Sequence, residues 1–120
     1  MESQIKKLQD SLGTIASEAF RFQKVFDKMI TKLSVDERGK YQSQFAWFTK
    51  KVNKALEDAG MNILNLEGEQ YDPGMAVTPL NIDDFDVDED LTIIQMLEPI
   101  IMHGDMVHKT GTVILGRKEE

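Results

Sequence analysis

The feature that most constrains this chain is a heptad repeat of apolar residues near its start. From Ile5 onward, alternating steps of three and four residues reach an apolar side chain every time as far as Leu33. The nine positions are Ile5, Leu8, Leu12, Ile15, Ala19, Phe22, Phe26, Met29 and Leu33. Such a repeat keeps one stripe of a helix facing a partner helix. Neighbouring apolar residues widen the stripe, which favours a helical bundle over an isolated two-stranded coiled coil.

A second helix is predicted from Ser34 to about Ala59. Ser34 and Glu37 have the spacing of a capping box, and Gly60 suits a left-handed residue after the helix. The apolar residues between these ends again step by three and four, at Tyr41, Phe45, Phe48, Val52, Ala55 and Ala59. Because the connection between the two helices is short, we expect an antiparallel helical hairpin.

Two helices leave much of this apolar surface exposed, so we expect self-association. The simplest arrangement is a homodimer in which two hairpins form a four-helix bundle. The residues expected at the dimer interface are Phe22, Phe26, Met29, Phe45, Trp47, Phe48 and Val52. The simpler interpretation of these aromatic residues is core packing, which we favour over any role in binding a ligand.

Charge and hydrophobic period both change near residue 67. Residues 1–66 hold 11 basic and 8 acidic side chains, whereas residues 67–120 hold 3 basic and 13 acidic side chains. Short apolar runs and turn residues replace the helical period in this second part. We therefore predict an α+β fold, with a helical dimerisation region at 1–60 and a small β-rich partner-docking domain at 61–120.

The β-rich part is predicted as strands separated by turns. Extended segments are expected at 61–66 and 76–82, and a long strand at 91–102 that is interrupted or bulged at Pro99. A turn at His103-Gly104-Asp105 leads to a return strand over 106–115, with Gly111 as the candidate bulge.

Composition excludes several classes of function. The net charge of −7 is opposite to that of a protein that binds a nucleic-acid backbone. The absence of cysteine excludes a disulfide scaffold, a cysteine nucleophile and a thiolate zinc site. There is no apolar run of transmembrane length and no signal peptide, so we expect a cytoplasmic protein without membrane contact.

The acidic segment 83–90 is the one candidate cation site. Counting from Asp84, aspartates fall on the first, third, fifth and seventh positions of a calcium loop. However, Glu89 replaces the glycine that the sharp turn needs, and Gln95 replaces the bidentate carboxylate. A solvated acidic loop is the favoured interpretation, with calcium binding as the alternative.

No other motif supports an active site or a cofactor. His103 and His108 are the only histidines, and two ligands do not complete a structural zinc site. Lys109-Thr110-Gly111 and the SxxK match at residues 3–6 are chance matches to penicillin-recognising enzymes, whose SDN element is missing. Because no nucleophile–base pair is visible, we expect a protein that is not an enzyme and that holds no metal or cofactor.

The order of elements resembles GrpE, the nucleotide exchange factor of DnaK-type chaperones. The resemblance extends from about Ala19 to Arg117. It rests on a helix that ends at Gly60, the turn Asp72-Pro73, the pair Ala76-Val77, an acidic stretch, and an apolar strand that runs through Met96 to Gly104. A closing strand at 112–115 completes the order.

The resemblance implies a homodimeric co-chaperone whose β-rich domain docks on the nucleotide-binding domain of a DnaK-type chaperone or a related ATPase. It implies that docking promotes nucleotide release. On this basis the expected partner contacts are Met96, Asp105, Met106, His108 and Lys109. Because residues 67–120 are strongly acidic, the partner surface is expected to be basic and binding to weaken with salt.

The chain also departs from the family pattern. The family's long paired N-terminal stalk is nearly absent, and Gly74 and Met75 stand where the family has a histidine. Asp105 and His108 occupy positions at which the family usually has arginine, and a basic contact that becomes acidic would repel the family's partner. The alternative function is therefore a dimeric adaptor or scaffold without exchange activity.

Overall fold

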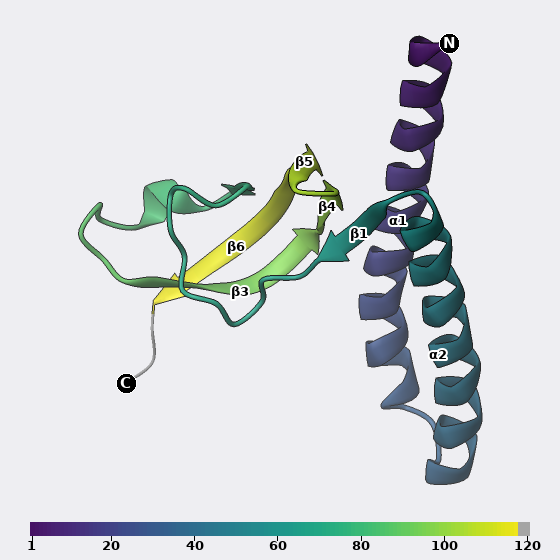
Figure 1. Cartoon of the computed structure of the whole chain (residues 1–120). Helices are drawn as coiled ribbons and strands as arrows, with labels where there is room; N and C mark the ends of the chain where they lie inside the picture. Colours follow the sequence, from purple (N-terminus) through teal and green to yellow (C-terminus); the bar gives the residue numbers. More distant parts are fainter. Residues whose placement is uncertain (118–120) are drawn as a thin grey trace. The chain divides into compact units, whose positions relative to one another are not determined.

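The computed structural model describes residues 1–117. The chain divides into two compact units, Met1–Asn62 and Ile63–Glu120. Two helices are followed by six short strands (Figure 1), so the predicted α+β fold is confirmed. We call the first part the helical unit and the second the β unit, and describe each by itself.

The helical unit is an antiparallel hairpin of α1 (Glu2–Ile30) and α2 (Val35–Asp58). Both predicted helices are confirmed, although Leu33 lies in the turn between them. The first turns of α1 extend beyond the end of α2 (Figure 1), so this part of the heptad repeat has no partner in the hairpin. Ile5 and Leu8 are accordingly 52% and 70% exposed.

The ends of α2 are fixed by local contacts. The amide of Glu37 donates to the Ser34 hydroxyl at 3.3 Å, as a Ser N-cap requires. Arg38 reaches back across the turn and donates from Nε to the Ile30 carbonyl and from Nη2 to the Leu33 carbonyl, both at 3.2 Å. Gly60 has a φ of 74°, which is the predicted left-handed position after the helix.

The β unit contains two three-stranded sheets. The strands are β1 (Met61–Leu64), β2 (Val77–Pro79), β3 (Leu91–Glu98), β4 (Ile100–His103), β5 (Met106–Lys109) and β6 (Gly111–Arg117). One sheet has the order β1-β4-β5 and the other the order β2-β6-β3. In the second sheet β6 runs parallel to β2 and antiparallel to β3.

Two predicted long strands are each divided between the two sheets. The run 91–102 breaks at Pro99 into β3 and β4, because proline lacks the N–H that a continuous ladder needs. The run 106–115 breaks at Thr110 into β5 and β6. The bulge expected at Gly111 lies instead in β3, whose register against β6 shifts between Ile93 and Gln95 and again between Met96 and Glu98.

Apolar residues of several strands form the core of the β unit. Along β6, Gly111, Val113 and Leu115 are buried while the residues between them are partly exposed. The buried hydrophobic side chains of the two sheets come from β1, β3, β4 and β6, and are Met61, Leu91, Ile93, Met96, Ile100, Ile101, Val113 and Leu115. The period of two along β6 is what a strand with one covered face produces, whereas in β4 the consecutive residues Ile100 and Ile101 are both buried.

The outer edge of β3 is covered by the segment 66–71. The amide of Gly68 donates to the Ile93 carbonyl at 2.8 Å, and the amide of Tyr71 donates to the Leu91 carbonyl at the same distance. The turn region therefore runs along the strand and supplies hydrogen bonds that a further strand would otherwise make.

Between Ile82 and Asp84 the chain forms a single turn of 3-10 helix, where an extended segment ending at Ile82 was expected. Neither helix of the described residues combines the length and the apolar character needed to cross a bilayer.

Candidate interaction surfaces

An aromatic cluster joins the two helices of the hairpin. The rings of Phe26 and Phe45 stack with centroids 4.4 Å apart, and Phe22 and Phe48 lie 6.0 and 5.6 Å from Phe45. Phe26 and Phe45 are only partly exposed. They therefore act mainly within one hairpin, as the interior of a two-helix contact.

One side of the hairpin presents a largely apolar surface, which we call the Phe48 face. Its exposed or partly exposed apolar residues are Leu12, Ile15, Ala19, Phe22, Val25, Phe48, Val52 and Ala55, and the charged residues Glu18, Arg21 and Lys51 border it. Two hollows of about 480 and 220 Å³ open on this face, and Phe48 lines both. Ile15, Phe22, Val25 and Phe48 are between 44% and 62% exposed. Met29 continues the stripe one further turn along α1 and is 53% exposed.

Of the residues expected at a dimer interface, Phe22, Met29, Phe48 and Val52 therefore share one face of the hairpin. An exposed apolar patch of this extent on a small unit is typical of an interaction site.

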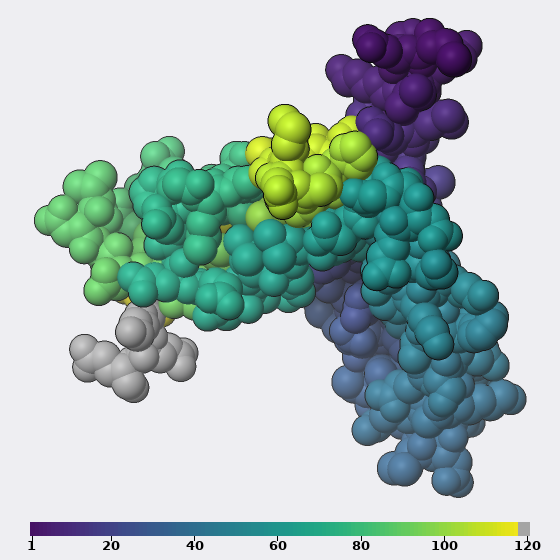
Figure 2. Space-filling view, viewed as in Figure 1, coloured from purple at the N-terminus to yellow at the C-terminus, as the bar shows by residue number. Residues whose placement is uncertain are grey.

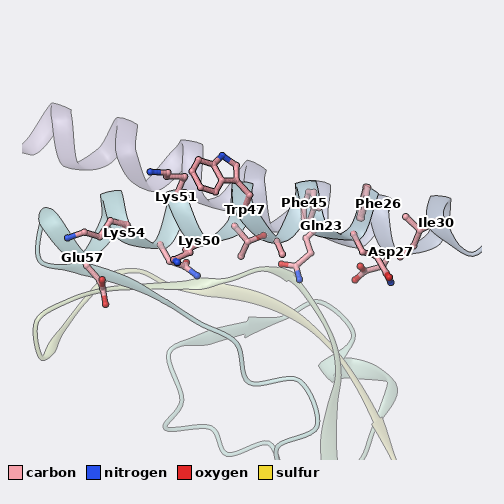
Figure 3. Close-up of a pocket in the computed structure, with 14 residues that line it drawn as sticks. Gln23, Phe26, Asp27, Ile30, Phe45, Trp47, Lys50, Lys51, Lys54 and Glu57 are labelled. Atoms are coloured by element: carbon pink, nitrogen blue, oxygen red, sulfur yellow. The ribbon is translucent and has the colours of Figure 1, made fainter. Parts of the chain in front are cut away.

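Trp47 lies apart from the Phe48 face. It is 63% exposed, and the ammonium of Lys51 stands 4.6 Å from the centroid of its ring. Trp47 lines a groove of about 840 Å³ along the hairpin, to which both helices contribute. Figure 3 shows Phe26, Ile30 and Asp27 toward one end of this groove and Lys50, Lys51 and Lys54 toward the other. We call it the Trp47 groove.

Charged side chains border the Trp47 groove. Lys54 donates to Asp58 at 2.8 Å, and this hydrogen bond raises the pKa of Lys54 above its ordinary value. Glu57 and Asp27 supply carboxylates, while Lys50 and Lys51 supply further cations. The groove thus has aromatic rings in a largely polar lining, and its lysine end also carries the Glu57 carboxylate.

The hairpin of β4 and β5 carries two exposed apolar residues of the sheet β1-β4-β5. Met106 and Val107 are 74% and 45% exposed. Gly104 has a φ of 61°, which allows the predicted tight turn between the two strands. The hairpin, yellow-green in Figure 2, lies at the surface of the β unit. We call it the β4–β5 hairpin.

Four of the five expected partner contacts lie on this hairpin. Asp105 and Met106 are exposed, whereas His108 and Lys109 are partly exposed. Lys109 forms an ion pair with Glu98 at 3.3 Å, and Thr112 donates to the same carboxylate at 3.1 Å. The register pairs His103 with Met106, so the two histidines are not directly opposite one another.

The structure contradicts the expectation that Met96, the fifth of these residues, contacts a partner. Its side chain is fully buried in the sheet core, and its sulfur accepts a hydrogen bond from the amide of Leu66 at 3.3 Å. A side chain in this position packs the β unit and offers no surface to a partner.

The acidic segment is attached to β6 at both ends. The amide group of Asn81 bridges Leu115, donating to its carbonyl and accepting from its N–H, both at 2.9 Å. Arg117 pairs with Glu89 at 2.6 Å and lies 5.0 Å from the ring centroid of Phe85. Hydrogen bonds from Arg117 and from the amide of Asp86 lower the pKa of Glu89.

No three histidine, aspartate or glutamate side chains within residues 1–117 are grouped so that they could hold a metal ion. The spacing of aspartates along 83–90 is therefore not matched by converging ligands in the described part of the chain.

Sequence reasoning missed Val107, Lys50 and Lys51 as surface residues of interest. A signal for the lysines exists, because residues 38–56 contain five basic and no acidic side chains.

Comparisons of the chain with models of protein families, with curated proteins and with solved structures found no match.

Proposed function

We propose that this chain is a GrpE-like homodimeric co-chaperone that binds the nucleotide-binding domain of a DnaK-type or related ATPase and promotes nucleotide release. The observation that carries the proposal is the separation of two exposed apolar surfaces onto two units. The Phe48 face lies on the helical unit, and Met106 with Val107 lies on the β unit. The resemblance in element order from about Ala19 to Arg117 supplies the family.

The Phe48 face supports self-association. Burying a large apolar side chain that was exposed stabilises an assembly by roughly 1.5–3 kcal/mol. In a two-fold dimer each such residue is buried twice, because the same patch occurs on both copies. Phe22, Phe48 and Val52 then form the centre of a four-helix bundle.

The β4–β5 hairpin supports docking. An apolar pair at the tip of a short hairpin can enter a hollow of a partner, while Asp105 and His108 beside it determine charge preference. Docking accelerates nucleotide release when the ATPase binds the hairpin more tightly with its nucleotide cleft open than closed. No chemical step by this chain is required, so we propose that it is not an enzyme.

The direct test is release of a fluorescent ADP analogue from the DnaK-type ATPase of the same cell. The protein at a concentration equal to that of the ATPase should raise the release rate on the order of tenfold or more, and added salt should reduce the effect. Met106→Asp should abolish most of the acceleration, because it places a charge where an apolar contact is made.

Val87→Asp is the matched control for Met106→Asp. Val87 is fully exposed in the same unit, so the control adds the same charge away from the hairpin. No acceleration by the unaltered protein, together with no complex on gel filtration, would show that the exchange function is wrong.

The alternative is a dimeric adaptor without exchange activity. Asp105 and His108 favour it, because an acidic residue replaces a basic contact of the family at the docking hairpin. The adaptor predicts a stable homodimer, measured by light scattering, together with an unchanged rate of nucleotide release.

A further inference from the structure

The middle of α2 is the most basic stretch of the chain. Residues 38–56 carry Arg38, Lys40, Lys50, Lys51 and Lys54 and no acidic side chain. The rest of the molecule has the opposite balance, since the whole chain has a net charge of −7. A local excess of positive charge in a chain of negative net charge can attract negatively charged partners to that part of the surface.

The Trp47 groove lies within this basic stretch. Its volume of about 840 Å³ is large enough for several side chains of a bound segment. Phe45, Phe26 and Ile30 supply apolar walls, and Trp47 is 63% exposed beside them. An exposed tryptophan next to a hollow is a common anchor of protein–protein contacts.

This groove is distinct from the surface proposed for dimerisation. Apart from Lys51, the residues that line it differ from those that line the two hollows of the Phe48 face. Trp47 lines the groove and neither hollow, whereas Phe48 lines both hollows and not the groove. A dimer formed through the Phe48 face leaves Trp47 without a partner.

We propose that the Trp47 groove binds an acidic peptide segment of another protein, with an apolar side chain as its anchor. Lys50 and Lys51 meet the carboxylates of the peptide, and the exposed ring of Trp47 receives its apolar side chain. The proposal does not rest on the exchange function, because it does not use the β4–β5 hairpin and shares only Lys51 with the hollows of the Phe48 face.

Carboxylates lie toward both ends of the groove. Figure 3 shows Asp27 near Ile30 at one end and Glu57 beside Lys54 at the other. Lys54 is paired with Asp58 at 2.8 Å. Lys50 and Lys51 are therefore the cations that meet the carboxylates of a bound peptide.

An acidic peptide fits this surface better than a nucleic acid or a membrane. A nucleic-acid binder neutralises many phosphates, whereas this groove offers three lysines and also carries Asp27 and Glu57. A helix that lies on a membrane presents a convex apolar face, whereas the apolar side chains here line a hollow.

Trp47 makes the test direct, because it is the only tryptophan in the chain. The probe is a short synthetic peptide of glutamates around a central leucine pair, titrated into the full-length protein at low salt. Binding should shift the emission of Trp47 to shorter wavelength in a saturable manner, and added salt should weaken it. A second peptide with serine in place of the leucines should bind more weakly, because it lacks the apolar anchor.

Charge reversal separates the groove from the general charge of the protein. Lys50→Glu with Lys51→Glu should weaken binding on the order of tenfold or more. Lys6→Glu with Lys7→Glu is the matched control, because it makes the same change in net charge on the exposed first turns of α1. Circular dichroism of both double variants checks that the helices are intact.

Three results would overturn the proposal. The first is no change in Trp47 emission with the glutamate–leucine peptide, and the second is equal weakening by the two double variants. The third is a response to an RNA oligonucleotide, to anionic lipid vesicles or to protein concentration alone, without a response to the peptide. Protein concentration alone would mean that a second copy covers the groove.

Discussion

Gly111 and Met96 lie so close in the β unit that a Cβ atom on Gly111 would stand 2.6 Å from Cε of Met96. The Glu98 carbonyl would stand 3.0 Å from the same Cβ, and main chain cannot move aside as a side-chain end can. Gly111→Ala should therefore destabilise the β unit by about 1–3 kcal/mol, as overpacking of a core does. Urea unfolding followed by circular dichroism measures the change.

Gly39→Ala is the matched control for Gly111→Ala. Gly39 lies in α2, and a Cβ there would meet nothing within 4 Å. The same substitution should stabilise the helical unit by about 0.4–1 kcal/mol, because it lowers the entropy of the unfolded chain. Loss of stability in both variants, to the same extent, would contradict the close approach at Gly111.

The side-chain amide of Asn81 makes two hydrogen bonds with the main chain of Leu115, as a neighbouring strand would. Asn81→Asp retains an acceptor for the Leu115 N–H but loses the donor to the Leu115 carbonyl, so we expect destabilisation by about 1–3 kcal/mol. Asn62→Asp makes the same change at an exposed position, and thermal unfolding of the two variants should differ. Equal melting temperatures would show that the bridge contributes nothing.

Glu89 should titrate below the ordinary pH range of a glutamate. The hydrogen bond from Arg117 lowers the pKa of Glu89 in the folded chain, followed by the hydrogen bond from the Asp86 amide. Because the folded pKa lies below the unfolded one, this stabilisation is complete above the unfolded pKa and is lost as pH falls through the folded pKa. The side-chain carboxyl carbon, followed by NMR over acidic pH, reports the titration.

Arg117→Gln tests the cause of that pKa shift. The variant should move the pKa of Glu89 back up toward its ordinary value, because it removes the first of the two causes. Lys109→Gln removes one cation from the same unit without touching Glu89 and should leave the Glu89 titration unchanged. An unaltered Glu89 pKa in Arg117→Gln would mean that the ion pair does not persist in solution.

Phe48→Ser should dissociate the proposed homodimer into monomers. Phe48 lines both hollows of the Phe48 face, and loss of its burial on each copy should raise the dimer dissociation constant at least about tenfold. Val35→Ser removes an 80% exposed side chain at the start of α2 and should leave the dimer intact. Light scattering over a range of protein concentrations distinguishes the two variants, and identical masses would contradict dimerisation through this face.

The helices could be predicted from sequence because their signals are local. The heptad repeat, the Ser34 cap and Gly60 each act within a few residues, and the helix bounds follow them closely. The sheets depend on pairing between distant segments, such as β2 with β6, which apolar runs do not specify. The run 91–102 therefore shows that strands are present but not that Pro99 divides them between two sheets.

The candidate surfaces were predictable only in part, for a related reason. Met96 and Met106 both lie in apolar runs of the sequence, yet Met96 is fully buried and Met106 is 74% exposed. Similarly, the steps of three and four along the second helix include Phe48 and leave out Trp47, but they do not show that the two side chains line different hollows of the hairpin. Burial depends on how the strands pair and on which side of α2 packs against α1, and neither can be predicted from the local sequence pattern.

The segment 66–71 has a consequence for how copies of this protein meet one another. Strand edges with unpaired main-chain groups join edge to edge, and growing aggregates begin in this way. Gly68 and Tyr71 occupy two carbonyls of β3 that such a contact would need. Shortening the segment 66–71 would therefore expose the edge of β3 to pairing with another copy. The length of this segment thus prevents edge-to-edge polymerisation and also connects two strands.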